Sequence, residues 1–318
     1  MILSVSRRTD IPNYYSDWFY NRLQEGWLCV RNPMNPRQVS RLTITPETVD
    51  AIVFWTKNPQ PMLSRLGELA EYPYYIQFTL SGYGKDLEPG IPSKREQMLS
   101  VFVQLAERVG AERVVWRYDP ILFTPGYTPG YHIKAFSEIA KALEGHTKRV
   151  VISFLDLYAK TKRNLKGWKL IPENEIAQSD LLPEAARMEF SFFIQELAAC
   201  AQAHGMEIFT CAEQMELSSY GIRHGSCIDQ TWIEQLLGYP VLVKKDRNQR
   251  SACGCIESID IGTYHTCRNG CRYCYANENQ ERVKALSGQY DPHAPILCGQ
   301  ITKEDTVTER VCHKLPKA

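Results

Sequence analysis

Seven short runs of apolar and β-branched residues alternate with helical patterns, and this alternation constrains the fold of the chain more than any other feature. The runs cover residues 2–6, 51–56, 74–80, 113–117, 150–155, 207–210 and 258–261. Apolar residues at helical spacing follow most of them, at about 16–24, 61–69, 94–109, 131–143 and 183–203. Such alternation is typical of parallel strands joined by crossover helices. Because several runs are almost entirely apolar, we predict an α/β fold, a partial or complete (β/α) barrel.

Two stretches interrupt the alternation, and a tail follows it. Residues 27–44 place two Asn-Pro pairs between β-rich runs, which predicts a hairpin insertion. Residues 211–255 form a cysteine-rich segment. We therefore expect one barrel domain over residues 1–286, followed by a C-terminal tail over 287–318 that wraps around the domain or hangs loose.

The charge balance excludes a strongly charged chain. The sequence has 37 Lys+Arg against 36 Asp+Glu and a net charge of +1. This removes the whole-chain electrostatic argument for binding nucleic acid or an acidic membrane, although a local basic groove stays open. No stretch approaches the roughly 20 apolar residues of a membrane span, and the N-terminus lacks the pattern of a signal peptide. We expect a cytoplasmic protein with no membrane partner.

The 11 cysteines are unexpected in such a chain. A chain of this size does not need disulfides and the cytosol keeps thiols reduced, so metal binding is the first hypothesis. Cys267, Cys271 and Cys274 form a C-x3-C-x2-C pattern directly after the last predicted strand. Barrel enzymes carry their active sites in loops at that end of a strand. Three thiolates can hold three corners of a [4Fe–4S] cluster and leave the fourth iron without a protein ligand.

This loop resembles the cluster motif of the radical S-adenosylmethionine (SAM) superfamily, in which an aromatic residue, here Tyr273, precedes the third cysteine. The resemblance implies that the open iron chelates the amino and carboxylate groups of SAM. It further implies that reductive cleavage of SAM yields a 5′-deoxyadenosyl radical, which abstracts hydrogen from the substrate. An electron donor such as a flavodoxin or ferredoxin would supply the electron.

Three further segments resemble the spore photoproduct lyase-like branch of that superfamily. That branch follows its cluster loop with Thr-Asp-Pro, Thr-Lys and Glu-Pro-x-x-Pro-Ser segments, and similar segments lie here at residues 9–12, 56–59 and 88–93. They begin near residue 1, whereas the cluster strand comes last, which implies a circularly permuted barrel whose first and last strands are neighbours. The whole chain also resembles the domain of unknown function 1848 (DUF1848) family, known for a C-terminal cysteine cluster of radical SAM type. That family implies no substrate.

Four other cysteines form a candidate second metal site, namely Cys211, Cys227, Cys253 and Cys255. They could hold a second iron–sulfur cluster or zinc if the fold brings them together. Inert packing and a single catalytic thiol are the alternatives. The remaining cysteines have no partner at metal-ligand spacing and are expected to be packing or surface residues: Cys29, Cys200, Cys298 and Cys312.

Polar residues at the ends of the predicted strands supply the other candidates. If the strands are in register, these residues share one rim, where the carboxylate, amine and ribose of SAM need donors and acceptors. The expected SAM contacts are Thr9, Asp10, Lys57, Asn58, Thr79, Ser81 and Tyr273. The expected catalytic residues are Arg117, Asp119 and Asp156, with Arg7 and Glu213 on the same rim. Structural salt bridges at the rim are the alternative.

Three functions therefore stay open. The first is an iron–sulfur, SAM-dependent radical enzyme acting on an unknown small-molecule or nucleic-acid-derived substrate. The second is a zinc-stabilised binding protein whose basic segment 244–250 contacts nucleic acid, although zinc sites favour C-x2-C pairs and need a fourth ligand. The third is a barrel enzyme that uses Arg117, Asp119 and Asp156 in acid–base chemistry and keeps a structural cluster.

Overall fold

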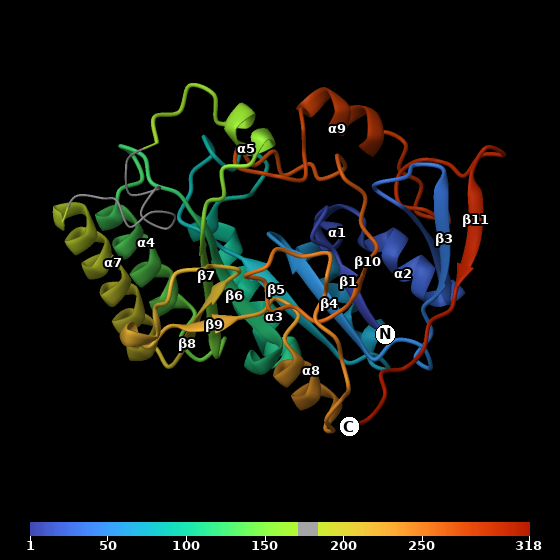
Figure 1. The fold of residues 1–318 in the computed structure, drawn as a ribbon, viewed down its shortest axis with the longest axis horizontal. Coiled ribbons are helices and arrows are strands. Elements are labelled where there is room, and N and C mark those ends of the chain that lie inside the picture. Colours follow the sequence, from blue (N-terminus) through green and yellow to red (C-terminus); the bar gives the residue numbers. More distant parts are fainter. Residues whose placement is uncertain (171–183) are drawn as a thin grey trace.

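The predicted strands pair into one parallel sheet in a computed structural model of the protein, which describes residues 1–170 and 184–318 (Figure 1). The strands, in spatial order, are β10 (Ile259–Asp260), β1 (Ile2–Val5), β4 (Ala51–Thr56), β5 (Tyr74–Thr79), β6 (Val114–Ile121), β7 (Arg149–Phe154), β8 (Glu207–Cys211) and β9 (Arg223–Gly225). Every neighbouring pair is parallel. The α/β fold class is thus confirmed. Of the strands described in this sheet, β9 alone was not predicted, because three residues are too few to show a periodicity.

Among the described residues this sheet is open, because its pairing runs from β10 to β9 without joining these two edge strands. The arrangement agrees with a partial barrel. Strand β10 lies beside β1, with Leu3 opposite Ile259 and Ser4 opposite Asp260. The strand of this sheet that comes last in the sequence therefore pairs with the strand that comes first.

Helices connect the strands, as the spacing of apolar residues predicts. The larger ones are α2 (Ser16–Glu25), η1 (Gln60–Leu69), the continuous pair of η2 (Lys94–Met98) and α3 (Leu99–Val109), α4 (Pro129–Ala142) and α7 (Glu184–Ala203). Two details differ from the expectation, since η1 is a 3₁₀ helix and η2 is a π-helical turn. Residue 183, the predicted start of α7, lies outside the described residues. The shorter helices are α1 (Ile11–Tyr14), η3 (Ala111–Arg113), α5 (Ala159–Asn164), η4 (Ser218–Tyr220), α8 (Gln230–Leu237) and α9 (Gln280–Ser287).

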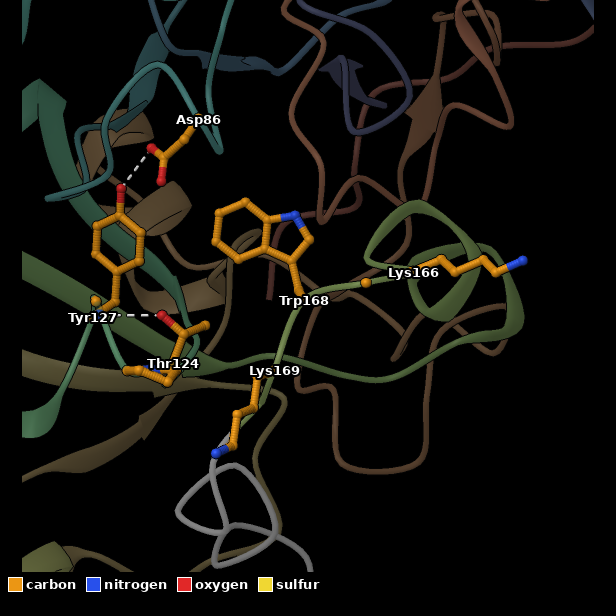
Figure 2. Close-up of a pocket in the computed structure, with 9 residues that line it drawn as sticks. Asp86, Thr124, Tyr127, Lys166, Trp168 and Lys169 are labelled. Atoms are coloured by element: carbon orange, nitrogen blue, oxygen red, sulfur yellow. Dashed lines mark hydrogen bonds between the residues drawn. The ribbon is translucent and has the colours of Figure 1, made fainter.

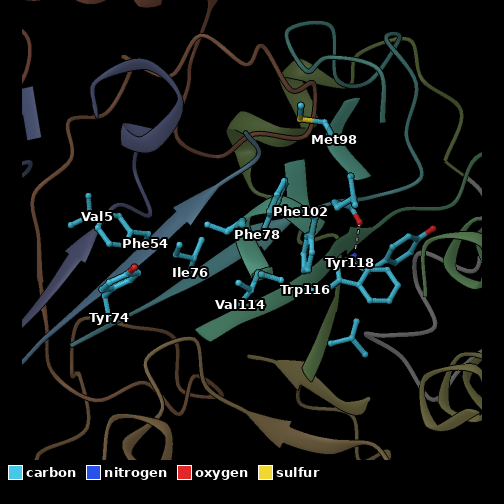
Figure 3. Close-up of a cluster of buried hydrophobic side chains, with 14 of the residues drawn as sticks. Val5, Phe54, Tyr74, Ile76, Phe78, Met98, Phe102, Val114, Trp116 and Tyr118 are labelled. Atoms are coloured by element: carbon cyan, nitrogen blue, oxygen red, sulfur yellow. Dashed lines mark hydrogen bonds between the residues drawn. The ribbon is translucent and has the colours of Figure 1, made fainter. Parts of the chain in front are cut away.

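The main core lies between the sheet and the helices that follow its strands (Figure 3). Phe78 of β5 stacks on Phe102 of α3 with ring centroids 4.9 Å apart, and Trp116 of β6 lies 4.7 Å from Phe136 of α4. Burial of one such side chain stabilises the fold by about 1.5–3 kcal/mol. Because alternate residues of a strand point to opposite faces, the other face of the sheet carries a separate buried cluster that includes four cysteines. Across the described residues, no helix combines the length and the apolar character needed to cross a membrane.

A small second sheet lies beside the large one. Strands β2 (Trp27–Arg31) and β3 (Gln38–Thr43) form an antiparallel hairpin, and β11 (Thr306–Arg310) pairs with β3 in parallel. The chain beyond residue 287 therefore runs back along this hairpin (Figure 1). The amino group of Met1 also donates to the carbonyl of His313 at 2.6 Å, so the two ends of the chain meet.

Candidate metal centre and its surroundings

Asp260 fixes the point at which the cysteine loop leaves the sheet. Its carboxylate accepts hydrogen bonds from Ser4 Oγ at 2.7 Å, Ser6 Oγ at 2.6 Å and the amide of Arg7 at 2.8 Å. The ends of β1 and β10 are thereby tied together. The next residue but one is Gly262, where a Cβ would lie 2.0 Å from Ser6 Oγ. The start of the loop is thus held by contacts between residues 4–7, near the N-terminus, and residues 260–262.

The cysteine loop, residues 261–276, has no helix or strand and is held by side chains from other loops. Asn269 accepts a hydrogen bond from Tyr14 Oη at 2.8 Å and donates through Nδ2 to Asp10 Oδ2 at 2.9 Å. The amide of Gly90 donates to the carbonyl of Asn269 at 2.9 Å. Gly270 has a φ of +69°, a conformation that favours glycine. The Arg-Asn-Gly sequence between the first two cysteines therefore fixes the loop conformation.

The three thiols of this loop are shielded from solvent. Cys271 is buried, and Cys267 and Cys274 are half-buried. Burial raises the pKa of Cys267 to about 12 and also raises the pKa values of Cys271 and Cys274 above the ordinary range. The amide of Ala276 donates to Cys274 Sγ at 3.3 Å. Coordinated cysteines are deprotonated, so a bound metal would displace the protons that burial keeps on these thiols.

Helix α5 also contacts the cysteine loop, through the side chain of Asn164. Asn164 Nδ2 donates to the carbonyls of Cys274 at 3.2 Å and Asn277 at 3.3 Å. Helices α5 and α9 lie over the same end of the sheet (Figure 1). Among the described residues, no group of three or more His, Cys, Asp or Glu side chains stands in an arrangement that could hold a metal ion, so a metal would have to move the thiols together.

Glu88 is the centre of a buried ionic network beside the loop. Glu88 is 1% exposed and accepts hydrogen bonds from Lys57 Nζ at 2.8 Å, from Ser81 Oγ at 3.0 Å and from the hydroxyl of Tyr273, and it also pairs with Lys94. Burial alone would raise the pKa of Glu88, but the two lysines outweigh it and lower that pKa to about 2. Three of the predicted SAM contacts, Lys57, Ser81 and Tyr273, therefore donate to the carboxylate of Glu88. In the sequence, Glu88 was noted only as the first residue of a Glu-Pro segment.

Asp10 joins the loop to the ends of β1 and β4. Its Oδ2 accepts from the amide of Lys57 at 2.9 Å and from Asn269 Nδ2 at 2.9 Å, and its Oδ1 caps α1 through the amide of Asn13 at 3.2 Å. Asn58, another predicted SAM contact, donates through Nδ2 to Asn13 Oδ1 at 3.1 Å. Asp10 and Asn58 are therefore engaged in hydrogen bonds that position the loop.

Replacing Gly90 with alanine is expected to loosen the cysteine loop. The added Cβ would stand 2.6 Å from the carbonyl oxygen of Asn269 and 2.8 Å from that of Arg268, so backbone would have to move. Overpacking of this kind costs about 1–3 kcal/mol. We expect a lower unfolding midpoint and faster alkylation of the loop cysteines by N-ethylmaleimide, read residue by residue by mass spectrometry. Gly67→Ala is the matched control, because a Cβ there meets nothing within 4 Å. Equal behaviour of the two variants would contradict this role of Gly90.

Two predicted SAM contacts lie outside these networks. Thr9 is 5% exposed, and its Oγ1 is a buried atom without a hydrogen-bond partner in the described part of the chain. Thr79 ends β5 opposite Arg117. Sequence reasoning missed Asn277, whose Nδ2 donates to the carbonyl of Cys267 at 2.8 Å and whose Oδ1 is likewise buried without a described partner. Its position three residues after Cys274 was the only signal.

Two of the three predicted catalytic residues, Arg117 and Asp119, pair with each other, and the third, Asp156, has a different partner. Arg117 is 5% exposed and donates through Nε to Asp119 Oδ1 at 3.1 Å, whereas Asp156 pairs with Arg250 at the surface. Glu213 accepts a hydrogen bond from the backbone amide of Phe154 at 2.8 Å, and burial raises the pKa of Glu213 to about 7. A carboxyl with that pKa is suited to proton exchange near neutral pH.

A pocket of about 390 Å³ opens beside the loop (Figure 2). Segments that follow β5, β6 and α5 line it with Asp86, Thr124, Pro125, Gly126, Tyr127, Lys166, Gly167, Trp168 and Lys169. Tyr127 and Trp168 also pack in a buried cluster that contains Cys271 and Tyr273. The pocket and the cysteine loop therefore share one wall. The sequence did not indicate these residues, because they lie on loops without a motif.

The predicted basic segment lines a second pocket, of about 540 Å³. Its lining residues are Lys244, Lys245, Asp246, Arg247, Gln249, Arg250 and Ser251. Two of its cations are engaged within the protein, because Lys245 Nζ donates to the carbonyl of Ser251 at 2.8 Å and Arg250 pairs with Asp156.

Comparison with known proteins identifies one family. The family model described as "Domain of unknown function (DUF1848)" matches residues 2–276, a range that ends with the cysteine loop. No curated protein matches the chain. Among solved structures, an endoglucanase aligns at 9% sequence identity over 70% of this chain and 89% of its own, with a TM-score of 0.22. That likeness carries no argument about fold or function.

Proposed function

The chain belongs to the DUF1848 family, and we propose that it is an iron–sulfur enzyme that binds a [4Fe–4S] cluster through Cys267, Cys271 and Cys274 and cleaves SAM at that cluster. The observation that carries the proposal is the three-thiol loop at the carboxyl end of β10, directly beside β1. Loops at this end of parallel strands are where α/β enzymes hold their reactive groups.

The donor set of the loop fits a cluster with one open iron. Asp10 is in electrostatic contact with Cys267, and Glu88 with Cys271. Each of them already accepts at least three hydrogen bonds, so neither is available as a fourth ligand. Three thiolates then leave one iron to a small chelating molecule. The amino and carboxylate groups of SAM form such a chelate.

When bound, the reduced cluster supplies the electron that breaks a carbon–sulfur bond of SAM. The residues of this chain orient the loop and exclude water. Glu88, Lys57 and Tyr273 hold one side of the loop, and Asp10 and Asn269 hold the other. Because these groups are buried, they shield a reactive species from solvent.

Two buried atoms are available to contact SAM. Thr9 Oγ1 can donate to a carboxylate or hydroxyl, and Asn277 Oδ1 can accept from an amine. Both lack a hydrogen-bond partner in the described part of the protein. They belong to residues that flank the loop, since Thr9 follows β1 and Asn277 binds the carbonyl of Cys267.

The order of the strands supports the permuted radical SAM-like fold that we propose. Because β10 lies beside β1, the segments that follow β10, β1, β4 and β5 lie in the spatial order of the cysteine loop, Thr9-Asp10, Lys57 and Glu88. This spatial order is the one that the resemblance to the photoproduct lyase-like branch implies.

The pocket beside the loop is the proposed substrate site. A volume of about 390 Å³ falls in the range of small-molecule sites. Trp168 offers a ring for stacking, and Asp86 and Lys169 offer charges of both signs. We propose a polar, ring-bearing small molecule or nucleotide fragment as substrate, and a flavodoxin or ferredoxin as electron donor.

Anaerobic reconstitution of the wild-type protein tests this function. We expect about four iron and four sulfide per chain, iron–sulfur absorption bands, and 5′-deoxyadenosine from SAM once dithionite is added. A reconstituted protein that holds no iron or sulfide, or a cluster that leaves SAM intact, would overturn the proposal. Zinc without iron or sulfide would favour a zinc-stabilised binding protein.

A further inference from the structure

Four buried cysteines meet on the face of the sheet opposite the main core. Cys211 ends β8, Cys227 follows β9, and Cys253 and Cys255 precede β10. Their exposed fractions are 8%, 8%, 6% and 1%, respectively. Cys211 Sγ and Cys227 Sγ are 3.0 Å apart, and Cys255 is in hydrogen-bonding contact with both Cys227 and Cys253. One chain of sulfur contacts therefore links all four residues.

The cysteines come from both edges of the open sheet. Strand β9 is one edge and β10 is the other. The segment between them crosses the sheet (Figure 1), and the amide of Ile256 donates to the carbonyl of Ile228 at 3.1 Å. That hydrogen bond lies next to Cys227 on one side and Cys255 on the other. The sulfur atoms thus gather where the two edges approach each other.

The backbone around these cysteines is tightly fixed. Gln77 Nε2 donates to the carbonyl of Cys227 at 2.8 Å, and the amide of Asp246 donates to the carbonyl of Cys255 at 2.9 Å. At Gly254 an added Cβ would stand 2.5 Å from Ser226 Oγ, so the residue between the two cysteines is confined. The backbone that carries these cysteines is therefore fixed before any ligand binds, and only the side chains need to adjust.

Cationic and amide donors face the sulfur atoms. Arg117 Nη1 donates to Cys227 Sγ at 3.0 Å, and the amide of Ile228 lies 3.4 Å from Cys255 Sγ. Arg7 is in electrostatic range of Cys255 and Cys227. A neutral thiol is a weak acceptor, whereas a coordinated thiolate is anionic and is commonly hydrogen-bonded by its surroundings. These donors suit thiolates.

We propose that Cys211, Cys227, Cys253 and Cys255 bind one thiophilic divalent ion, Zn²⁺ or Fe²⁺, in a tetrathiolate site that joins the two edges of the sheet. On binding, the four thiols release four protons to solvent, which leaves a centre of charge −2 that faces Arg117 and Arg7. Cys211 Sγ and Cys227 Sγ must separate from 3.0 Å to about 3.8 Å, the spacing of a tetrahedral zinc site.

A single ion fits this group better than the alternatives. In a [4Fe–4S] cube each thiolate binds a different iron, so the thiolates stand farther apart than these contacts allow. A disulfide between Cys211 and Cys227 would leave Cys253 and Cys255 without a role. The site goes beyond the proposed function, because it needs none of the loop cysteines.

A variant without the loop cysteines separates this site from the proposed cluster. In Cys267→Ala/Cys271→Ala/Cys274→Ala, purified anaerobically, we expect about one zinc or iron per chain and no sulfide. Adding Cys255→Ser should lower the bound metal at least about tenfold, whereas adding Cys298→Ser, at another buried thiol, should leave it unchanged. The result does not depend on whether the loop binds a cluster in the wild-type protein.

Two further readouts apply to the loop variant itself, so the test stands even if the Cys255 variant does not fold. With the ion bound, the four cysteines should resist N-ethylmaleimide until a chelator is added. Chelation should then lower the unfolding midpoint and speed hydrogen exchange of the Ile256 amide, which crosses between the sheet edges. A folded variant that binds no metal, contains four iron and four sulfide, or forms a Cys211–Cys227 disulfide would overturn the proposal.

Discussion

Cys271→Ala is expected to remove the iron–sulfur absorption bands and to reduce 5′-deoxyadenosine formation from SAM to the level seen without enzyme. Cys271 is the middle ligand of the C-x3-C-x2-C loop and is 9% exposed. Its side chain packs in the same buried cluster as Tyr273 and Leu87, so no nearby water can take its place as a ligand without opening that cluster. Two remaining thiolates would not hold a four-iron cube at this loop.

The measurement is iron, sulfide and product per chain after identical anaerobic reconstitution. Cys29→Ala is the matched control, because Cys29 is also buried, at 3% exposed, but lies in β2 of the small sheet. Cys29→Ala should keep both cluster and activity. If Cys271→Ala retained both, the loop could not be the cluster site, and the enzyme hypothesis would lose its main support.

The central strands of the large sheet could be predicted because a strand that is buried on both faces is a continuous run of apolar residues. Ala51–Thr56 and Tyr74–Thr79 are almost entirely apolar, as central strands of a parallel sheet must be. Strand β9 carries Arg223 and His224 and is exposed at the sheet edge, so it has no such run.

The candidate site was predictable where its residues are close in the sequence. The spacing of Cys267, Cys271 and Cys274 is local and therefore visible. The contact between Cys211 and Cys255 through Cys227 depends on how the two sheet edges approach, so spacing alone could only suggest it. Trp168 approaches the loop through tertiary packing and carried no motif. Asn277 directly follows the loop but is not part of the cysteine spacing.

Glu88 illustrates the same limit for an ionic network. Its Glu-Pro segment is visible in the sequence, but its two lysine partners come from the loop after β4 and from η2. Only the order of β4 and β5 in the sheet places these groups together. The resemblance to the photoproduct lyase-like branch indicated the Glu-Pro segment, whereas the pairing of the strands explains why the Glu88 carboxylate binds two lysines.

Glu88→Gln is expected to lower the free energy of unfolding by about 3–5 kcal/mol at pH 7, because it leaves Lys57 and Lys94 largely buried without their anionic partner. The lowered pKa of Glu88, about 2 against an ordinary 4.5, corresponds to a similar figure of about 3 kcal/mol. Tyr273 also loses a charged acceptor, so the cysteine loop should loosen and SAM cleavage should fall with stability.

The pH dependence of this difference identifies its cause. A carboxyl whose folded pKa is depressed contributes stability that is fully present above its unfolded pKa and is lost as the pH falls through the folded value. The gap between wild type and Glu88→Gln should therefore shrink by about 2 kcal/mol between pH 7 and pH 3, measured by urea unfolding. Glu309→Gln removes an exposed partner of Arg41 and should cost less than about 1 kcal/mol at either pH. A gap for Glu88→Gln that is equally small, or that does not change with pH, would mean that this buried carboxylate does not hold the loop through its charge.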